Sequence, residues 1–126
     1  PKAKAVDGVI KALEKADIIV LGPGSLYTSI IPNLLVDGVV DAIKKSNAVK
    51  IYVCNIMSQA GETENYTVSD HLAAIERHSY EGIADIVIAN NAIIPESLRI
   101  KYASEHAREV MIDSINVLKR AKTCAR

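Results

Sequence analysis

Residues 18–36 read IIVLGPGSLYTSIIPNLLV, an apolar run that is interrupted by glycine, proline and serine before apolar residues return. The segment Asp17–Leu21 is typical of a short strand, and the segment after Ser25 is typical of a helix. A turn from a strand into a helix leaves backbone N–H groups without partners, and an anion or a hydroxyl-rich ligand can accept their hydrogen bonds. We therefore interpret Gly22–Ser25 as a ligand-binding turn suited to a phosphorylated compound.

Strands and helices alternate along the rest of the chain. Further apolar runs predict strands at Lys50–Asn55, Asp85–Ala89 and Glu109–Asp113. Apolar residues at helical spacing and capping signals predict helices near Val6–Leu13, Asp37–Lys45, Thr67–Ser79, Pro95–Ala107 and Ile115–Lys122. This alternation implies right-handed βαβ units, so we expect one α/β domain over residues 1–126, with three layers and a mainly parallel sheet of about four strands.

Three local signals refine the helix ends. We expect Ser25 to cap the helix that follows it, and Pro32 to end or kink that helix. Thr67, followed three residues later by Asp70, predicts a capping box.

Composition narrows the class of protein. Among the 126 residues 49% are hydrophobic, yet Phe and Trp are absent, so the core must be built from aliphatic side chains, as is usual in parallel sheets. The 15 Lys and Arg balance the 15 Asp and Glu, which argues against non-specific attraction to nucleic acid or anionic lipid. No apolar run approaches the roughly 18 residues of a membrane span, and no signal region is visible. Cys54 and Cys124 suggest neither a disulfide framework nor a zinc site, so we expect a cytoplasmic protein with Cys54 as a buried thiol.

Polar residues follow each of the first three predicted strands. Ligands of open parallel sheets bind beyond the carboxyl ends of the strands, so these residues are expected to share one site for a sugar or nucleotide. They are Gly22, Gly24, Ser25, Tyr27 and Thr28 after the first strand, Asn55 and the 57–67 loop after the second, and Asn90 and Asn91 after the third.

Each signal also has an ordinary structural explanation. The turn lacks the third glycine of a dinucleotide fingerprint and the Gly-Lys-Ser/Thr of a P-loop, so it can also be a simple tight turn. For His71 beside Asp70 we favour a surface histidine next to a first-turn aspartate over a general acid or base. Glu62 and Glu64 fit a solvated loop better than a cation site. The ring of Tyr102 can pack in the core or its hydroxyl can face a ligand.

No catalytic nucleophile can be recognised in the sequence. Ser25 lacks the surroundings of a nucleophile elbow, and Cys54 has no cationic neighbour in the sequence that would activate it. His78 and His106 are expected to face solvent, and none of the histidines has metal-ligand spacing to another. The residues themselves therefore favour binding over catalysis.

Three long stretches resemble the C-terminal part of the YvcK/CofD-like proteins: ADIIVLGPGSLYTSIIPNLLV, KIYVCNIMSQAGETENYTVSDH and NNAIIPESLRIKYA. That family has a branch of bacterial gluconeogenesis factors, also linked to cell shape, and a branch of 2-phospho-L-lactate transferases of deazaflavin coenzyme synthesis. GPGSLYTS and GETENYTVSDH are more similar to the gluconeogenesis-factor branch. The resemblance implies a Rossmann-like fold that binds UDP-sugars, notably UDP-N-acetylglucosamine.

The resemblance also assigns expected roles to residues. Tyr102 matches a position implicated in UDP-sugar binding, which favours the ligand-facing orientation. The family's Gly-rich first turn and the acidic segment after it have no counterpart here, so we expect a truncated form of the fold that holds part of a site. By the resemblance the ligand crevice is lined by Gly22, Gly24, Ser25, Tyr27 and Thr28, with Asn55, Thr67 and Asp70 near it. In our leading interpretation Asn55, Asn90 and Tyr102 contact sugar or base.

The leading interpretation is a nucleotide-sugar-binding regulatory protein linked to carbon metabolism and cell-wall morphogenesis. Its ligand is a UDP-sugar or another nucleoside diphosphate, with no cofactor in this segment and no nucleic acid or membrane partner. With half the family sheet absent, an exposed apolar edge or face favours a homo-oligomer. The alternative is a Mg²⁺-dependent transferase that moves a 2-phospholactyl group from a nucleotide carrier to a deazaflavin. A third possibility is a chain that neither binds nor catalyses by itself.

Overall fold

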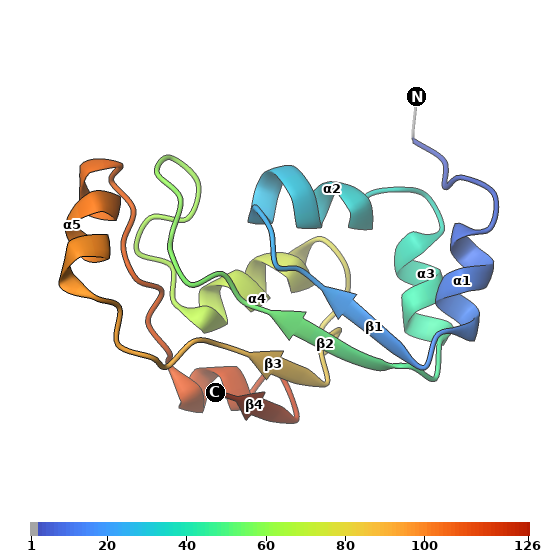
Figure 1. Ribbon diagram of the computed structural model, residues 1–126. Coiled ribbons are helices and arrows are strands. Elements are labelled where there is room, and N and C mark those ends of the chain that lie inside the picture. The colour runs from blue at the N-terminus through green and yellow to red at the C-terminus, as the bar shows by residue number, and fades with distance from the viewer. Residues whose placement is uncertain (1–2) are drawn as a thin grey trace.

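The computed structural model describes residues 3–126, apart from the side chain of Thr123, and contains one sheet of four parallel strands (Figure 1). The strands lie in the order β1-β2-β3-β4 and comprise β1 Ile18–Leu21, β2 Val49–Val53, β3 Ile86–Ile88 and β4 Thr123–Ala125. The helices are α1 Val9–Lys15, the π-helix η1 Leu26–Ile30, α2 Ile31–Leu34, α3 Val39–Lys45, α4 Val68–Arg77, α5 Glu96–Ser104 and α6 Ser114–Leu118. The predicted α/β fold with about four parallel strands is confirmed, whereas the expected third layer is not formed, because the helices that pack on the sheet lie on one of its faces.

The predicted fourth strand, Glu109–Asp113, is wrong. This segment makes one isolated antiparallel bridge, between Glu109 and Met57, and runs beside the 56–68 loop instead of beside β3. The fourth place in the sheet belongs to β4, in which Cys124 pairs with Val87. An extended segment that is buried under a loop has the same apolar pattern as a strand, so sequence alone did not separate the two cases.

Two expectations about helix ends can be compared with the structure. The capping box at the start of α4 is confirmed: the Thr67 N–H donates to Asp70 Oδ2 at 2.9 Å, and the Asp70 N–H donates to Thr67 Oγ1 at 3.2 Å. The helix after Ser25 changes its geometry next to Pro32, as expected: the π-helix η1 ends at Ile30, and Pro32 lies in the first turn of α2, which begins at Ile31.

The core is aliphatic, as the composition predicts, with one buried tyrosine. Leu26, Leu72, Ile75 and Val87 have no exposed surface, and Tyr52 is 1% exposed between them. These side chains lie between the sheet and the helices η1, α3, α4 and α6. Among the residues 3–126, no helix combines the length and the apolarity that crossing a membrane requires.

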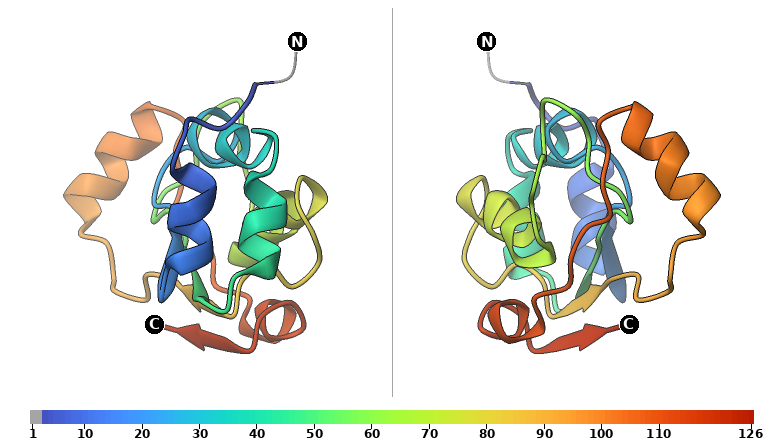
Figure 2. Two further views of the ribbon diagram at one scale, coloured as in Figure 1. Left: turned by 90° about the vertical axis from the view of Figure 1, so that its right-hand side faces the viewer. Right: turned by 90° about the vertical axis from the view of Figure 1, so that its left-hand side faces the viewer.

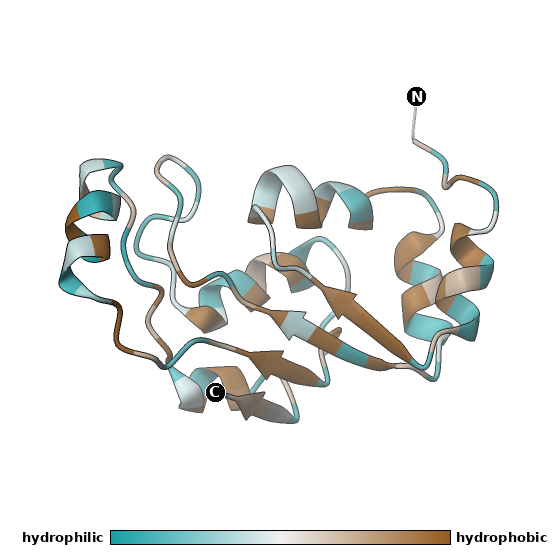
Figure 3. Ribbon diagram, in the orientation of Figure 1, coloured by the Kyte–Doolittle hydropathy of each residue, from teal (hydrophilic) through white to brown (hydrophobic). Residues whose placement is uncertain are grey.

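The helices that pack on the sheet lie on one of its faces. Because the strand order never reverses and βαβ crossovers are right-handed, the helices α3, α4 and α6, one in each crossover, are placed on the same side. Figure 2 shows α3 and α4 on that side, whereas α5 lies on the other side. Figure 3 views the sheet from the opposite side: β1 and β3 consist mostly of hydrophobic residues, and no helix crosses in front of the sheet in this view.

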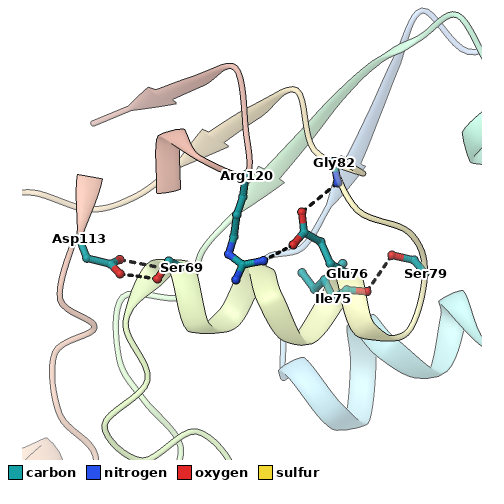
Figure 4. A network of polar contacts seen from close by, with 7 residues as sticks. All are labelled: Ser69, Ile75, Glu76, Ser79, Gly82, Asp113 and Arg120. Atoms are coloured by element: carbon teal, nitrogen blue, oxygen red, sulfur yellow. Dashed lines mark hydrogen bonds and ion pairs between the residues drawn. The ribbon is translucent and has the colours of Figure 1, made fainter. Parts of the chain in front are cut away.

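Polar contacts connect α4 to the C-terminal part of the chain (Figure 4). Glu76 is 9% exposed, and its carboxylate accepts from the Arg120 guanidinium at 2.5 Å and from the Gly82 N–H at 2.9 Å. At the other end of α4, the Ser69 N–H and hydroxyl donate to the Asp113 carboxylate. These contacts hold α6 and the turn before β4 against α4.

Candidate functional site

The glycine turn begins at the carboxyl end of β1, in contact with β2. Gly22 has a φ of +84°, and a Cβ built on it would lie 2.8 Å from the Val53 carbonyl oxygen. Both the backbone conformation and the close approach therefore require glycine at this position. Gly22 is a structural residue that brings the turn across the end of β2.

Asn55 connects the turn to the end of β2. Its Oδ1 accepts from the Gly24 N–H at 3.1 Å, and its Nδ2 donates to the Gly24 carbonyl at 2.8 Å. One amide side chain thus satisfies both backbone groups of Gly24. The structure confirms that the polar residues after the first two strands lie together, as parallel strands require.

Ser25 does not cap a helix, contrary to the sequence-based expectation. No cap hydrogen bond forms from its side chain; instead its Oγ accepts from Gln59 Nε2 at 2.9 Å. Gln59 is held in turn by its backbone N–H, which donates to Thr63 Oγ1 at 2.9 Å. The oxygen Gln59 Oε1 is buried without a hydrogen-bond partner in the described structure. The sequence indicated that this loop is functional but not that Gln59 would reach the turn.

Tyr27 points away from the turn, towards α4. Its hydroxyl is 2.9 Å from the Tyr66 hydroxyl, and the two rings meet edge to face at 6.5 Å. The hydrogen bond with Tyr27, together with burial, raises the pKa of Tyr66. Thr28 follows on η1 and is exposed. Tyr27 therefore packs between η1 and α4, which gives it a structural role here.

His71 is buried, so the interpretation as a surface histidine is wrong. It has no exposed surface, its Nδ1 lies 2.8 Å from the Thr67 carbonyl oxygen, and its Nε2 has no partner within the described structure. Burial lowers its pKa, which favours the neutral ring. Val68, His71, Leu72 and Ile75 form one helical stripe, a pattern that was visible in the sequence. His78 and His106 are exposed, as predicted.

Thr67 and Asp70 are occupied at the start of α4 by the capping box and by Asp113. Thr67 Oγ1 lies 3.0 Å from Asp113 Oδ2, and the Ser69 N–H donates to Asp113 Oδ1 at 3.0 Å. Partial burial alone would raise the pKa of Asp113, but the hydrogen bonds from Ser69 and Thr67 outweigh it, so the pKa is lowered. The role of Asp113 was missed from the sequence, because its segment has the pattern of a strand that ends at this residue.

Asn90 and Tyr102 make no hydrogen bond to the glycine turn within the described residues. Asn90 follows β3 and lines a cavity of about 300 Å³ with Cys54 and Arg126. Tyr102 is half-buried on the outlying helix α5. The structure thus brings together Gly22, Gly24, Ser25 and Asn55, with Gln59 added, at one end of the sheet.

The arrangement offers hydrogen-bonding groups but no activated nucleophile. The prediction that Cys54 is buried is confirmed, and burial raises the pKa of its thiol to about 11. Beside the turn, a groove of about 380 Å³ runs along β1 and is lined in part by Gly22, Ser29 and Asn33. Within the described residues, no three His, Cys, Asp or Glu side chains are grouped so that they could hold a metal ion.

Comparisons with known proteins agree with this fold. The family model for the 2-phospho-L-lactate transferase CofD matches residues 1–125. The gluconeogenesis factor of Halalkalibacterium halodurans is 52% identical over 82% of this chain and 32% of its own length, and the putative gluconeogenesis factor of Thermotoga maritima is 51% identical over 90% and 36%. A crystal structure of a UPF0052 family member from Bacillus halodurans superposes with a TM-score of 0.93 at 45% identity, over 98% of this chain and 40% of that one.

This chain spans about a third of the length of these curated relatives. The predicted position of the match, in the C-terminal part of the longer proteins, stays a prediction.

Proposed function

Because this chain belongs to the CofD family, we propose that it is a regulatory protein of the gluconeogenesis-factor type that binds a nucleotide sugar. The ligand is UDP-N-acetylglucosamine or a related nucleoside diphosphate, with its phosphates at Gly24 and Ser25. Roles in carbon metabolism and cell-wall morphogenesis and a cytoplasmic location are part of the same proposal. The curated relatives that share half of this sequence are named gluconeogenesis factors, which supports this branch over the transferases.

The observation that carries the proposal is the geometry of Gly24. Of the six glycines in the chain, it alone has a φ outside the left-handed region. A Cβ built on Gly24 would meet Ser29 Cβ at 3.4 Å, an ordinary van der Waals contact, so the fold itself has room for a methyl group here. A glycine that the fold does not need, in a polar turn at the end of a parallel strand, is explained by close approach of a ligand to the backbone.

Neighbouring groups fit a hydroxyl-rich or phosphorylated ligand. The helical segment 26–34 begins directly after Ser25, so its first N–H groups lie beside the turn and favour an anion. Gln59 Oε1 is a buried acceptor without a partner in the described structure, next to the Ser25 hydroxyl. A sugar hydroxyl or a phosphate can satisfy such groups, whereas an apolar ligand cannot.

Isothermal titration with UDP-N-acetylglucosamine tests the proposal. We expect Gly24→Ala to weaken binding at least fivefold while leaving the far-UV circular dichroism unchanged, because the methyl group occupies the ligand's place and disturbs nothing else. Ser97→Ala on the exposed surface of α5 is the matched control and should bind like the parent chain. Absence of binding at millimolar ligand, or equal binding by the Gly24→Ala variant, contradicts the proposal.

The second candidate is a transferase, which the name of the matching family model favours. Transfer of a 2-phospholactyl group to a deazaflavin in the presence of Mg²⁺ would establish it. The described residues present no acidic cluster that fits such a metal, and we derive no step through one.

A further inference from the structure

A polar pocket of about 290 Å³ lies between the 56–68 loop and residues 105–111, the segment that follows α5. Figure 1 shows this loop and α5 side by side at one end of the molecule. The volume is just below the roughly 300–1,000 Å³ of pockets for drug-sized ligands, so it suits a smaller compound. The turn at residues 22–25 contributes nothing to the lining, so the proposed UDP-sugar does not account for this pocket. The polar lining residues are Ser58, Glu64, Asn65, His106 and Arg108.

The two walls of the pocket are held to each other by hydrogen bonds. The Ser58 N–H donates to the Arg108 carbonyl at 2.7 Å, and the Arg108 N–H donates to Ser58 Oγ at 2.9 Å. Two residues further along, the Val110 N–H donates to the Ile56 carbonyl at 2.9 Å. The walls are thus fixed before any ligand binds, which lowers the entropic cost of binding.

His106 occupies a backbone position that usually belongs to glycine. It follows the C-terminal end of α5 with a φ of +57°, and the Ala107 N–H donates to the Tyr102 carbonyl at 2.9 Å, as in a Schellman motif. A Cβ is unfavourable in this left-handed region. Asn65 on the opposite wall, at +60°, is the one other non-glycine residue with a positive φ within residues 3–126. Strained backbone of this kind is concentrated at functional sites, so a ligand contact explains the histidine.

The two walls of the pocket contribute opposite charges. On the loop, Glu64 Oε1 accepts from the Gly61 N–H at 2.9 Å, which orients this carboxylate. The other wall contributes Arg108, whose guanidinium is a donor of up to five hydrogen bonds. In the part of the chain that the structure describes, no ion pair joins Glu64 to Arg108 or His106. These charged groups are therefore available to a ligand that bears both an anionic group and hydrogen-bond donors.

We propose that this pocket binds a small phosphorylated polyol. The guanidinium of Arg108 pairs with two phosphate oxygens, and an N–H of the His106 ring donates to the third. The hydroxyl groups of the ligand donate to the Glu64 carboxylate and accept from the Ser58 hydroxyl, which still has its proton to donate. An anion without hydroxyl groups offers no donor to Glu64, and a neutral polyol leaves Arg108 without an anion. This second site does not depend on the proposed UDP-sugar.

A ¹H–¹⁵N NMR titration with glycerol 3-phosphate tests the proposal. Glycerol and inorganic phosphate are the comparison compounds, because each lacks one half of this probe. We expect glycerol 3-phosphate to bind at least tenfold more tightly than either and to shift the amides of Ser58, Asn65 and Arg108. Equally tight binding of inorganic phosphate would overturn the proposal, and so would shifts that are largest at Gly24 and Ser25, since the phosphate would then lie at the turn.

Two arginine variants show whether this pocket is the one used. Arg108→Gln keeps the backbone hydrogen bonds to Ser58 and should weaken binding of glycerol 3-phosphate at least tenfold. Arg99→Gln is the matched control, because Arg99 lines the neighbouring groove along α5 but not this pocket, and it should change the affinity less than twofold. Equal effects of the two substitutions would overturn the proposal.

His106→Gly distinguishes a ligand contact from a structural role. Because glycine suits the left-handed backbone at this position, the midpoint of thermal unfolding should stay the same or rise. The affinity for glycerol 3-phosphate should nevertheless fall at least fivefold, because the ring N–H is lost. A lower midpoint would show that His106 serves the fold, and an unchanged affinity would show that it does not contact the ligand; either result would overturn the proposal.

Discussion

Replacing Gly22 by alanine should destabilise the protein strongly, whereas the same change at Gly24 should not. In the Gly22→Ala variant the new Cβ would lie 2.8 Å from the Val53 carbonyl oxygen and 3.2 Å from Ile30 Cδ1. Because the first of these atoms belongs to the backbone of β2, it cannot turn aside as a flexible side chain would. The strand end and the turn must therefore separate.

The cost follows from two effects. An alanine in the left-handed region costs about 1–2 kcal/mol, and forcing apart packed atoms costs about 1–3 kcal/mol. Restriction of the unfolded chain returns about 0.4–1 kcal/mol. The free energy of unfolding of Gly22→Ala should thus fall by about 3 kcal/mol, which for a chain of this size lowers Tm by about 10 °C. Gly24→Ala should lie within about 0.5 kcal/mol of the parent chain, because its Cβ meets only an ordinary contact.

Urea unfolding followed by circular dichroism at 222 nm measures both variants under the same conditions. The slope of the free energy with denaturant should stay the same, so that a change in midpoint reports stability. Equal losses in the two variants, or a larger loss for Gly24→Ala, would refute the division between a structural and a ligand-facing glycine.

Three further predictions concern the polar groups of α4. Asp113→Ala should lower the free energy of unfolding at pH 7 by about 2–3 kcal/mol, since the donors of Thr67 and Ser69 lose their acceptor. Because the pKa of Asp113 is lowered in the folded protein, its stabilising contribution is complete above the unfolded-state pKa of about 4 and is lost as the pH falls below that value. The free energy of unfolding, measured with urea, should therefore decrease less steeply between pH 7 and pH 3 in the variant than in the parent chain. In an NMR titration, the His71 ring should have a midpoint below 6.5, because burial lowers its pKa. The free energy of unfolding should then be unaffected by His71 above pH 6.5 and should decrease below it, because the unfolded chain binds the proton more readily. A midpoint above 6.5 would contradict burial of the neutral ring. Glu76→Ala should lower the free energy of unfolding by about 2–3 kcal/mol. Glu76→Gln should lower it clearly less, because the amide oxygen of glutamine can still accept from the Gly82 N–H. Equal losses of stability in thermal unfolding would show that this hydrogen bond is unimportant.

The periodic parts of the sequence predicted the fold well. β1 to β3 and the capping box of α4 follow from apolar runs and from Thr67 with Asp70, because these signals are local. The fourth strand was misplaced, because Val110 is buried against the 56–68 loop and only tertiary contacts distinguish that position from a sheet. The three residues of β4 are too few to show a strand pattern, so the apolar pattern of residues 109–113 gave the stronger strand prediction.

The part of the site that lies at the ends of β1 and β2 could be predicted from the sequence. Gly24 and Asn55 meet because parallel strands bring their carboxyl ends together. The contact between Ser25 and Gln59 depends on the path of a long loop, which local propensity does not determine. The contact between Tyr27 and Tyr66 could not be predicted from the sequence, because the direction of the Tyr27 side chain depends on its tertiary neighbours.

Binding at the rim formed by the ends of β1 and β2 can be measured residue by residue. In a ¹H–¹⁵N NMR titration of the protein with UDP-N-acetylglucosamine, the largest shifts should occur at the amides of Gly24, Ser25 and Asn55. Saturable shifts confined to α4 or α6, with these three amides unmoved, would place the ligand elsewhere and contradict the proposed site.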